Sequence, residues 1–223
     1  MPRILAIGDI HGCSTALDAL LQFVRPAADD RIITLGDYVD RGPDSRGVLD
    51  RLVELYRSGQ LIPLRGNHEV MMLAAEDSNS AFEFWTAVGG REALDSYSTD
   101  SLVDIPTSHW HFVKNQCLDW HESDRHIFVH ASLVYDLPMD EQPTEILMWE
   151  PISERTRRHQ SGKTMVCGHT EQRGGWPIVL PGIIGLDTWC YGDGWLTCLD
   201  VASGRIWQAN QAGQTRSGYL DVR

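Results

Sequence analysis

The sequence has no long apolar run and no closely spaced pair of cysteines. No stretch approaches the roughly 18 apolar residues of a membrane-spanning helix, and the apolar run near the first residue is too short for a signal-peptide core. The five cysteines are odd in number and widely spaced, which indicates reduced, mostly buried thiols. We therefore expect a protein of the reducing cytoplasm with no membrane partner.

Basic residues are also scarce. Nineteen Lys and Arg stand against 31 Asp and Glu, which gives a net charge of −12. A nucleic acid duplex or an anionic membrane surface needs basic patches, so neither is expected as the main partner. With 42% hydrophobic and 22% charged residues, the composition is that of an ordinary globular protein. The length of 223 residues predicts one domain over residues 1–223.

What the chain does contain is a repeated alternation of strand-like and helix-like segments in its first third. Short apolar runs each lead to a glycine followed by Asp or Asn, and the segments between them have the apolar spacing of amphipathic helices. Ser14 is the expected N-cap of the first helix. The alternation predicts parallel strands joined by right-handed crossovers. The predicted strands are residues 3–7, 31–35 and 61–64, and the predicted helices are residues 14–24 and 48–56.

Three polar residues, Asp9, Asp37 and Asn67, follow these strands directly after the glycines. Asp37 lies 28 residues after Asp9, and Asn67 lies 30 residues after Asp37, so each interval matches one strand–helix–strand unit of about 30 residues. The three side chains should therefore leave the carboxyl ends of neighbouring parallel strands. Open α/β sheets bind their ligands at that edge.

The rest of the chain has a different pattern. Residues 76–121 have helical apolar spacing and are expected to form an inserted helical segment. Two later apolar runs predict strands that end at His130 and just before His169. From Ile178 onward, Gly- and Trp-rich segments predict antiparallel strands.

The strand ends thus offer carboxylate, amide and imidazole groups together. Such a mixture suits Mn, Fe or Zn, whereas calcium prefers oxygen ligands alone. The number of groups predicts two divalent ions that share Asp37. One ion would take Asp9, His11 and Asp37, and the other Asp37, Asn67, His130 and His169.

Two divalent ions outweigh the charge of two carboxylates and a bridging hydroxide, so the site should attract phosphate although the protein is acidic. Metals about 3.5–4 Å apart generate hydroxide near neutral pH and bind the oxygens of an in-line displacement. The expected reaction is phosphoester hydrolysis. His68 is the expected general acid toward the leaving oxygen. Asp40 is its expected carboxylate partner, and Arg41 a bidentate phosphate ligand.

These motifs resemble those of a known family. The resemblance is to the calcineurin-like metallophosphoesterases, and within them to the phosphoprotein phosphatase branch. That branch contains bacterial and phage serine/threonine protein phosphatases and symmetrical diadenosine tetraphosphate hydrolases. The motifs are GDIHG at 8–12, GDYVDRG at 36–42, GNHE at 66–69, the strand-end His130 and GHT at 168–170.

The resemblance spans roughly residues 3–200 and implies an α/β fold of two facing mixed β-sheets flanked by helices. It also implies the metal ligands given above, a centre often filled by manganese with Fe or Zn as alternatives, and the same roles for His68, Asp40 and Arg41. The family usually carries a second phosphate-binding arginine just after a Trp, whereas here Trp149 is followed by Glu150. Arg155, Arg157 and Arg158 are the candidates for this place from further along the chain, and Arg155 is the one that we name.

Three functions are compatible with these residues. The leading hypothesis is a dinuclear, metal-dependent phosphatase that hydrolyses phosphomonoesters by direct attack of a metal-bridging hydroxide, with protein phosphoserine and phosphothreonine or a small phosphoester as substrate. The alternative enzyme is a symmetrical diadenosine tetraphosphate hydrolase or another nucleotide phosphohydrolase. A catalytically silent binding module on the same fold is the alternative of another class. The intact set of His68, Asp40 and ligands argues against it.

Overall fold

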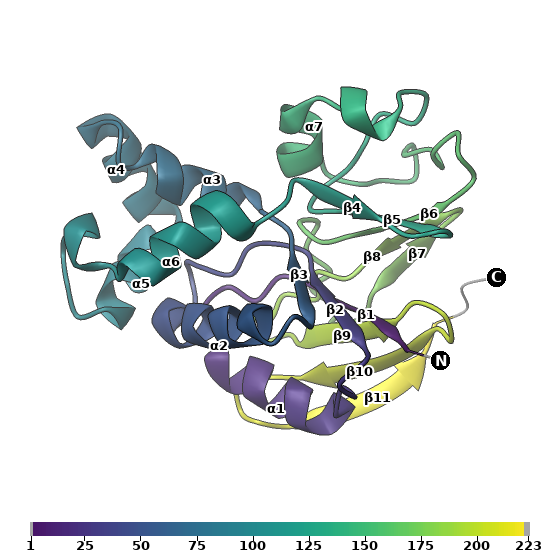
Figure 1. Cartoon of the computed structure of the whole chain (residues 1–223), viewed down its shortest axis with the longest axis horizontal. Coiled ribbons are helices and arrows are strands. Elements are labelled where there is room, and N and C mark those ends of the chain that lie inside the picture. Colours follow the sequence, from purple (N-terminus) through teal and green to yellow (C-terminus); the bar gives the residue numbers. More distant parts are fainter. Residues whose placement is uncertain (1, 221–223) are drawn as a thin grey trace.

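Two β-sheets lie face to face in the computed structural model, which describes residues 2–220 (Figure 1). Both sheets contain parallel and antiparallel neighbours. The first sheet has the order β11 (Thr215–Tyr219), β10 (Arg205–Ala209), β9 (Leu196–Asp200), β1 (Ile4–Ile7), β2 (Arg31–Thr34) and β3 (Leu61–Pro63). The second has the order β4 (Trp120–Glu122), β5 (His126–Val129), β6 (Thr164–Cys167), β8 (Ile183–Gly185) and β7 (Ile178–Leu180). The predicted fold of two facing mixed sheets flanked by helices is confirmed.

The repeated strand and helix pattern forms one half of the first sheet. Strands β1, β2 and β3 are parallel neighbours, with Ile4 opposite Arg31 and Ile32 opposite Leu61. Helices α1 (Ser14–Val24) and α2 (Ser45–Arg57) connect them. The expected N-cap of α1 was wrong by one residue, because Cys13 holds that position without a side-chain cap bond. Helix α2 has a capped start, where the Asp44 side chain accepts a hydrogen bond from the Gly47 amide at 2.9 Å.

The last third of the chain is distributed over both sheets. The predicted antiparallel strands form the β7–β8 hairpin of the second sheet and the β9–β10–β11 meander of the first. Strand β8 also runs parallel to β6, so the second sheet is mixed. Strands β4 and β11 had no counterpart in the sequence-based prediction.

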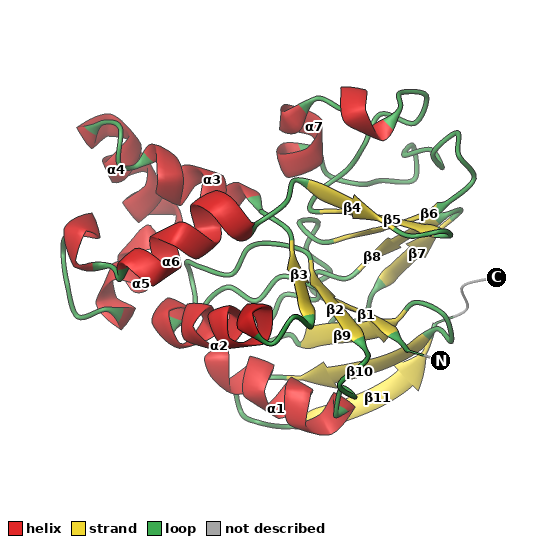
Figure 2. Cartoon of the chain, viewed as in Figure 1, coloured by secondary structure: helices red, strands yellow, loops and turns green. Residues whose placement is uncertain are grey.

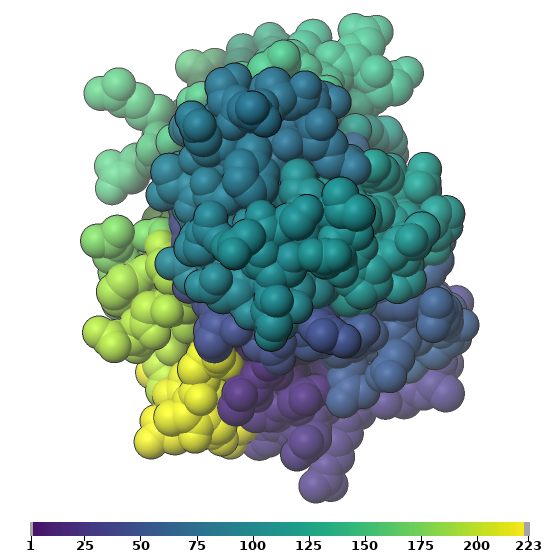
Figure 3. Space-filling view, turned by 90° about the vertical axis from the view of Figure 1, so that its left-hand side faces the viewer, coloured from purple at the N-terminus to yellow at the C-terminus, as the bar shows by residue number. Residues whose placement is uncertain are grey.

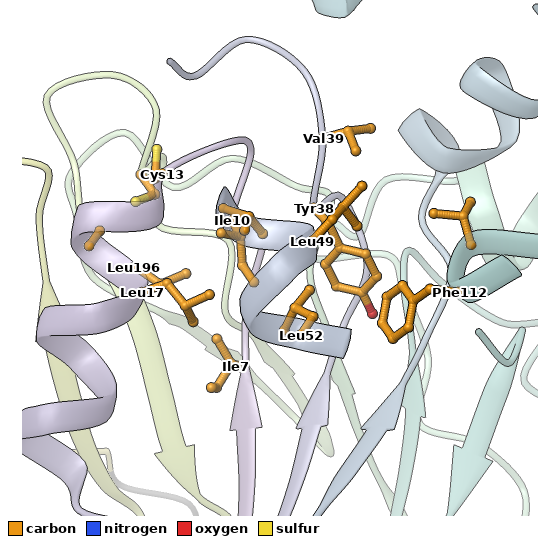
Figure 4. Close-up of a cluster of buried hydrophobic side chains, with 14 of the residues drawn as sticks. Ile7, Ile10, Cys13, Leu17, Tyr38, Val39, Leu49, Leu52, Phe112 and Leu196 are labelled. Atoms are coloured by element: carbon orange, nitrogen blue, oxygen red, sulfur yellow. The ribbon is translucent and has the colours of Figure 1, made fainter. Parts of the chain in front are cut away.

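Apolar side chains fill the space on each side of the first sheet. A buried cluster between the sheets includes Ile33, Phe128 and Ile184. A larger cluster joins the other face of the first sheet to the helices, and Figure 4 shows Leu17 of α1, Leu49 and Leu52 of α2 and Phe112 converging on it. Because these groups are almost fully buried, they fix the sheet whose strand ends carry the polar residues.

Most helices gather toward one end of the molecule, as Figure 2 shows in red. Most of the predicted helical segment 76–121 is helical, although its last residues enter β4. In Figure 3 the atoms of this segment cover much of the face that is turned toward the viewer. That it is an insertion stays a prediction. The remaining helices are α3 (Asn67–Ala74), α4 (Asn79–Trp85), α5 (Arg91–Ser96), α6 (Thr107–His111) and α7 (Thr144–Trp149), with π-helical turns at Thr86–Gly90 and Phe112–Gln116 and 3₁₀ turns at Leu102–Asp104 and Met139–Glu141.

Among the helices of residues 2–220, none combines the length and the apolar character needed to cross a membrane.

A buried histidine joins the helical segment to α2. His109 lies 2.8 Å from the Tyr97 hydroxyl and 3.0 Å from the Asp50 carboxylate, and burial lowers its pKa below the usual value although Asp50 opposes the shift. The unfolded chain therefore binds this proton more readily than the folded protein does. The contribution of His109 to stability is complete above the unfolded pKa of about 6.5 and declines as the pH falls below it.

We accordingly expect the Tm to fall between pH 7.5 and pH 5.5, and to fall less in His109→Gln. Thermal unfolding followed by circular dichroism at both pH values measures this difference. His111→Gln is the matched control, since it removes an exposed histidine from the same helix. An equal loss of Tm in His109→Gln and in the unsubstituted protein would contradict the assignment.

Candidate active site

The six predicted ligand residues converge where strand ends of both sheets meet. Asp9 and His11 follow β1, Asp37 follows β2, and Asn67 is the first residue of α3 just after β3. His130 and His169 follow β5 and β6 of the facing sheet. All are buried except His169, which is half-buried. The structure therefore brings together the residues that the spacing and the motifs had selected.

The backbone at this place is unusually strained. Among the described non-glycine residues with positive φ are His11 at 45°, Asp37 at 52° and His169 at 60°. Non-glycine residues rarely adopt this conformation, and functional sites are where it accumulates. Gly168 allows a close approach, because a Cβ atom at this position would lie 1.9 Å from Asp9 Oδ1. The chain thus turns sharply after each strand and points its polar side chains inward.

The donor atoms form two groups that share Asp37. Carboxylate and imidazole atoms of His11, Asp37 and His68 lie within 4.8 Å of one another, so His68 stands in this group where Asp9 was expected. The atoms of Asp37, His130 and His169 form the second group. Asp37 Oδ2 is 3.4 Å from His11 Nε2, and Asp37 Oδ1 is 3.5 Å from His130 Nε2. Asn67 Oδ1 joins the second group at 2.9 Å from His130 Nε2 and 3.1 Å from His169 Nδ1.

The protonation of these histidines fits a bound cation. His11 Nδ1 donates to the Val39 carbonyl at 2.9 Å, and His130 Nδ1 donates to the Leu35 carbonyl at 2.8 Å. Burial lowers the pKa of His11 to about 3 and that of His130 to about 4, so each ring is neutral at pH 7. Their Nε2 lone pairs then face the oxygens of Asp37 with no proton between them. Divalent metals bind this arrangement, and a carbonyl on the other ring nitrogen is the usual support of such ligands.

Excess carboxylate in the same place supports this conclusion. Asp9 Oδ1 is a buried oxygen without a hydrogen-bond partner among the described residues. Burial and the nearby Asp187 and Asp37 raise the pKa of Asp9 well above its usual value. Burial likewise raises the pKa of Asp187 and that of Glu69 to about 7. Positive charge is what this cluster lacks, and Asp9, His11, Asp37, Asn67, His130 and His169 are therefore suited to hold two divalent ions.

His68 pairs with a buried carboxylate beside these groups. Its Nδ1 lies 2.7 Å from Asp40 Oδ2, and the Trp85 indole donates to both Asp40 oxygens at 3.0 and 2.9 Å. Burial alone would lower the pKa of His68, but the charges of Asp37 and Asp40 and the hydrogen bond to Asp40 outweigh it and raise the pKa. The predicted pairing of His68 with Asp40 is present in the structure.

Arg41 reaches the same site from the loop after β2. Its Nη1 lies 3.3 Å from His11 Nε2 and 3.3 Å from Glu171 Oε1, and its guanidinium lies 4.9 Å from the centre of the Tyr191 ring. Arg155 lies elsewhere. It lines a hollow of about 450 Å³ together with Arg157 and Ser132. Of these, Ser132 lies two residues after His130 in the sequence. The structure thus brings Arg41 to the ligands, whereas Arg155 lines a hollow whose lining includes none of the six ligand residues.

Several residues at the site were missed by the sequence analysis. The Glu69 carboxylate accepts hydrogen bonds from the backbone amides of Asp37 and Gly66, both at 2.8 Å. Asp187 is buried two residues beyond β8, and Glu171 and Tyr191 contact Arg41. Glu69 and Asp187 had a visible signal, because one closes GNHE and the other follows an apolar run and a Gly-Leu pair. The others had none.

The model of calcineurin-like phosphoesterases matches residues 2–194 of this chain. The chain belongs to the calcineurin-like phosphoesterase family. This membership confirms the resemblance that the five motifs indicated, and it agrees with the two sheets and with the donor groups at their edge.

Relatives within this family carry two different names. A symmetrical bis(5'-nucleosyl)-tetraphosphatase of Pseudomonas syringae pathovar tomato is 32% identical over 132 residues, which are 58% of this chain and 40% of that protein. Serine/threonine-protein phosphatase 1 of Salmonella typhimurium is 39% identical over 89 residues, or 40% of this chain and 39% of that protein. These matches span less than half the length of either relative. A solved structure assigned as a diadenosine tetraphosphatase covers 100% of this chain and 97% of its own, with a TM-score of 0.65 and 22% identity.

Proposed function

We propose that this protein is a metal-dependent phosphatase that hydrolyses phosphomonoesters. The observation that carries the proposal is the buried His68–Asp40 pair, with its 2.7 Å contact, next to two donor groups that share Asp37. A cation-binding cluster with a general acid beside it is what hydrolysis of a phosphoester requires. An intact acid also argues against a silent binding module.

Asp9, His11, Asp37, Asn67, His130 and His169 would hold the two ions. When bound, the ions would supply Lewis acidity and lower the pKa of a bound water. The donor set of carboxylate, amide and imidazole suits manganese, with iron or zinc as further candidates. The carbonyls behind His11, His130 and His169 orient these rings.

The remaining side chains of the site would orient the phosphoryl group and protonate the leaving oxygen. The planar guanidinium of Arg41 matches two phosphate oxygens and would orient the phosphoryl group. His68 would give its proton to the leaving oxygen. Asp40 holds the ring of His68 in place and favours its charged form, and Trp85 holds Asp40 through the two indole hydrogen bonds.

The acid favours phosphoserine and phosphothreonine as substrates. Their leaving group is an alkoxide, which is strongly basic and needs protonation as the bond breaks. The leaving group from a polyphosphate is a phosphate oxygen, which leaves without a full proton. A charged imidazole next to the cluster is thus of most use toward an alkyl phosphate.

Dinucleoside tetraphosphates are the second candidate substrate class. The tetraphosphatase from Pseudomonas syringae is similar over more than half of this chain. The hollow lined by Ser132 also carries Arg155 and Arg157, two cations that suit the further phosphates of such a substrate. In this case Arg155 would bind a phosphate outside the reacting one.

Parallel assays separate the two classes. With manganese present, we expect hydrolysis of a phosphoserine peptide at a kcat/KM at least tenfold above that for diadenosine tetraphosphate. Chelation by EDTA should abolish both activities, and added manganese should restore them. Full activity without metal would refute the metal-dependent mechanism, and the reverse order of substrates would establish the second candidate.

We also propose the cytoplasm as the compartment of this protein. The five cysteines are free and buried in the structure, and this supports a reducing environment.

A further inference from the structure

One carboxylate contacts Arg41, the arginine that binds the phosphoryl group in the proposed function. Glu171 Oε1 lies 3.3 Å from Arg41 Nη1, and the side chains of Glu171 and Arg41 are only 21% and 32% exposed. A carboxylate and a phosphate oxygen compete for the same guanidinium hydrogens. Glu171 therefore occupies donors that substrate would need.

The position of Glu171 is itself fixed by other donors. The Tyr191 hydroxyl donates to Glu171 Oε1. Arg173 contacts Glu171 Oε2 through Nε at 3.3 Å and Nη2 at 3.2 Å, and its guanidinium lies 5.2 Å from the Trp189 ring. These contacts hold the Glu171 carboxylate at a defined position beside Arg41.

The Tyr191 ring also attracts Arg41 through its face, a contact separate from the hydrogen bond of its hydroxyl to Glu171. The guanidinium lies 4.9 Å from the ring centre, a distance at which a cation is attracted to an aromatic face. The same ring packs edge-on against His11 with 5.0 Å between centres. Arg41 can thus release Glu171 and remain beside the donor cluster.

We propose that Glu171 is a positioning residue that weakens phosphate binding by competing for Arg41. On this view, which rests on the proposed function, phosphate replaces Glu171 on the guanidinium while Tyr191 keeps the guanidinium in place. Glu171 thereby sets the affinity of the site for the phosphoryl group, and it favours release of the inorganic phosphate that the reaction produces.

The test is Glu171→Gln, which keeps the size of the side chain and an oxygen acceptor but removes the charge. For a partly exposed ion pair the loss of competition should be modest, so we expect the Kd of inorganic phosphate for the manganese-loaded protein to fall roughly three- to fivefold. Isothermal titration calorimetry measures this Kd. In the assay, KM and the Ki of phosphate should fall together, while kcat does not rise.

Two further variants isolate the cause. Glu141→Gln removes the same charge from an exposed position without a contact to Arg41 and should leave the phosphate Kd unchanged. In Arg41→Gln, adding Glu171→Gln should have no effect on the Kd, because the residue that is competed for is absent. High salt should reduce the gain in the single variant.

The outcomes separate this inference from the proposed function. An unchanged or weaker phosphate affinity in Glu171→Gln, or a gain that persists in Arg41→Gln, would overturn the role of Glu171 even if the protein hydrolyses phosphoesters. Absence of hydrolysis with a tighter phosphate Kd in Glu171→Gln would overturn the proposed function and support the role of Glu171. Absence of phosphate binding in every variant would refute both.

Discussion

His68→Asn is expected to lower kcat toward a phosphoserine peptide by roughly 10²-fold or more, the size of one general-acid contribution. Asn keeps a group that can hydrogen-bond to Asp40 but cannot transfer a proton. The side chains assigned to the two ions do not include His68, so two manganese ions per chain should remain bound. Steady-state kinetics together with metal analysis after dialysis measure the two quantities.

The effect of His68→Asn should depend on the leaving group. A nitrophenolate leaves without a proton, so the loss of activity should be much smaller toward p-nitrophenyl phosphate than toward the peptide. His121→Asn removes a half-buried histidine of β4 instead and serves as the control. Equal losses toward both substrates would mean that His68 does not act as an acid, and unchanged turnover would exclude it from the reaction.

The convergence at the sheet edge was predictable because it follows from chain geometry. Three strands at intervals of about 30 residues must be parallel neighbours, and their carboxyl ends then meet. Asp9, Asp37 and Asn67 are placed by this argument alone. His130 and His169 come from the second sheet, whose position no local spacing determines. Their place at the ends of predicted strands, together with the order of the motifs, selected them.

The details of the site could not be predicted in this way. The left-handed backbone at His11, Asp37 and His169 is imposed by tertiary packing against local preference. Glu171 contacts Arg41 across 130 residues of sequence, and such a contact leaves no periodic signal. The strand β11 escaped prediction because its sequence, TRSGY, is polar and its burial alternates between exposed and half-buried residues. It stands at the edge of the sheet, where one partner strand is enough.

The proposed site would attract phosphate although the protein as a whole is negatively charged. The net charge of −12 describes the surface as a whole, whereas the cluster around Asp37 consists of buried carboxylates that need cations. When bound, two divalent ions together with Arg41 would reverse the local sign of the charge. The strength of that reversal depends on Asp37, since both donor groups contain it.

Asp37→Asn is therefore expected to have the largest effect of any single substitution. In the unsubstituted protein the backbone amide of His68 donates to Asp37 Oδ1 at 3.0 Å. Asn keeps a side-chain oxygen that can accept this hydrogen bond, so the fold should be retained. It removes the charge that both groups share, and both ions should be lost after dialysis. Since metal ions contribute several kcal/mol to stabilising transition-state charge, kcat/KM should fall by about 10³-fold or more.

Metal binding and thermal stability provide the decisive comparison. A ligand present at 100 times its Kd stabilises the folded state by about 2.7 kcal/mol, so manganese should raise the Tm of the unsubstituted protein and leave that of Asp37→Asn unchanged. Asp9→Asn changes the donors expected for one ion and should lose one ion. Asp95→Asn, an exposed position on α5, should retain both. Retention of two ions by Asp37→Asn, or equal losses in Asp37→Asn and Asp9→Asn, would show that Asp37 does not join the two groups.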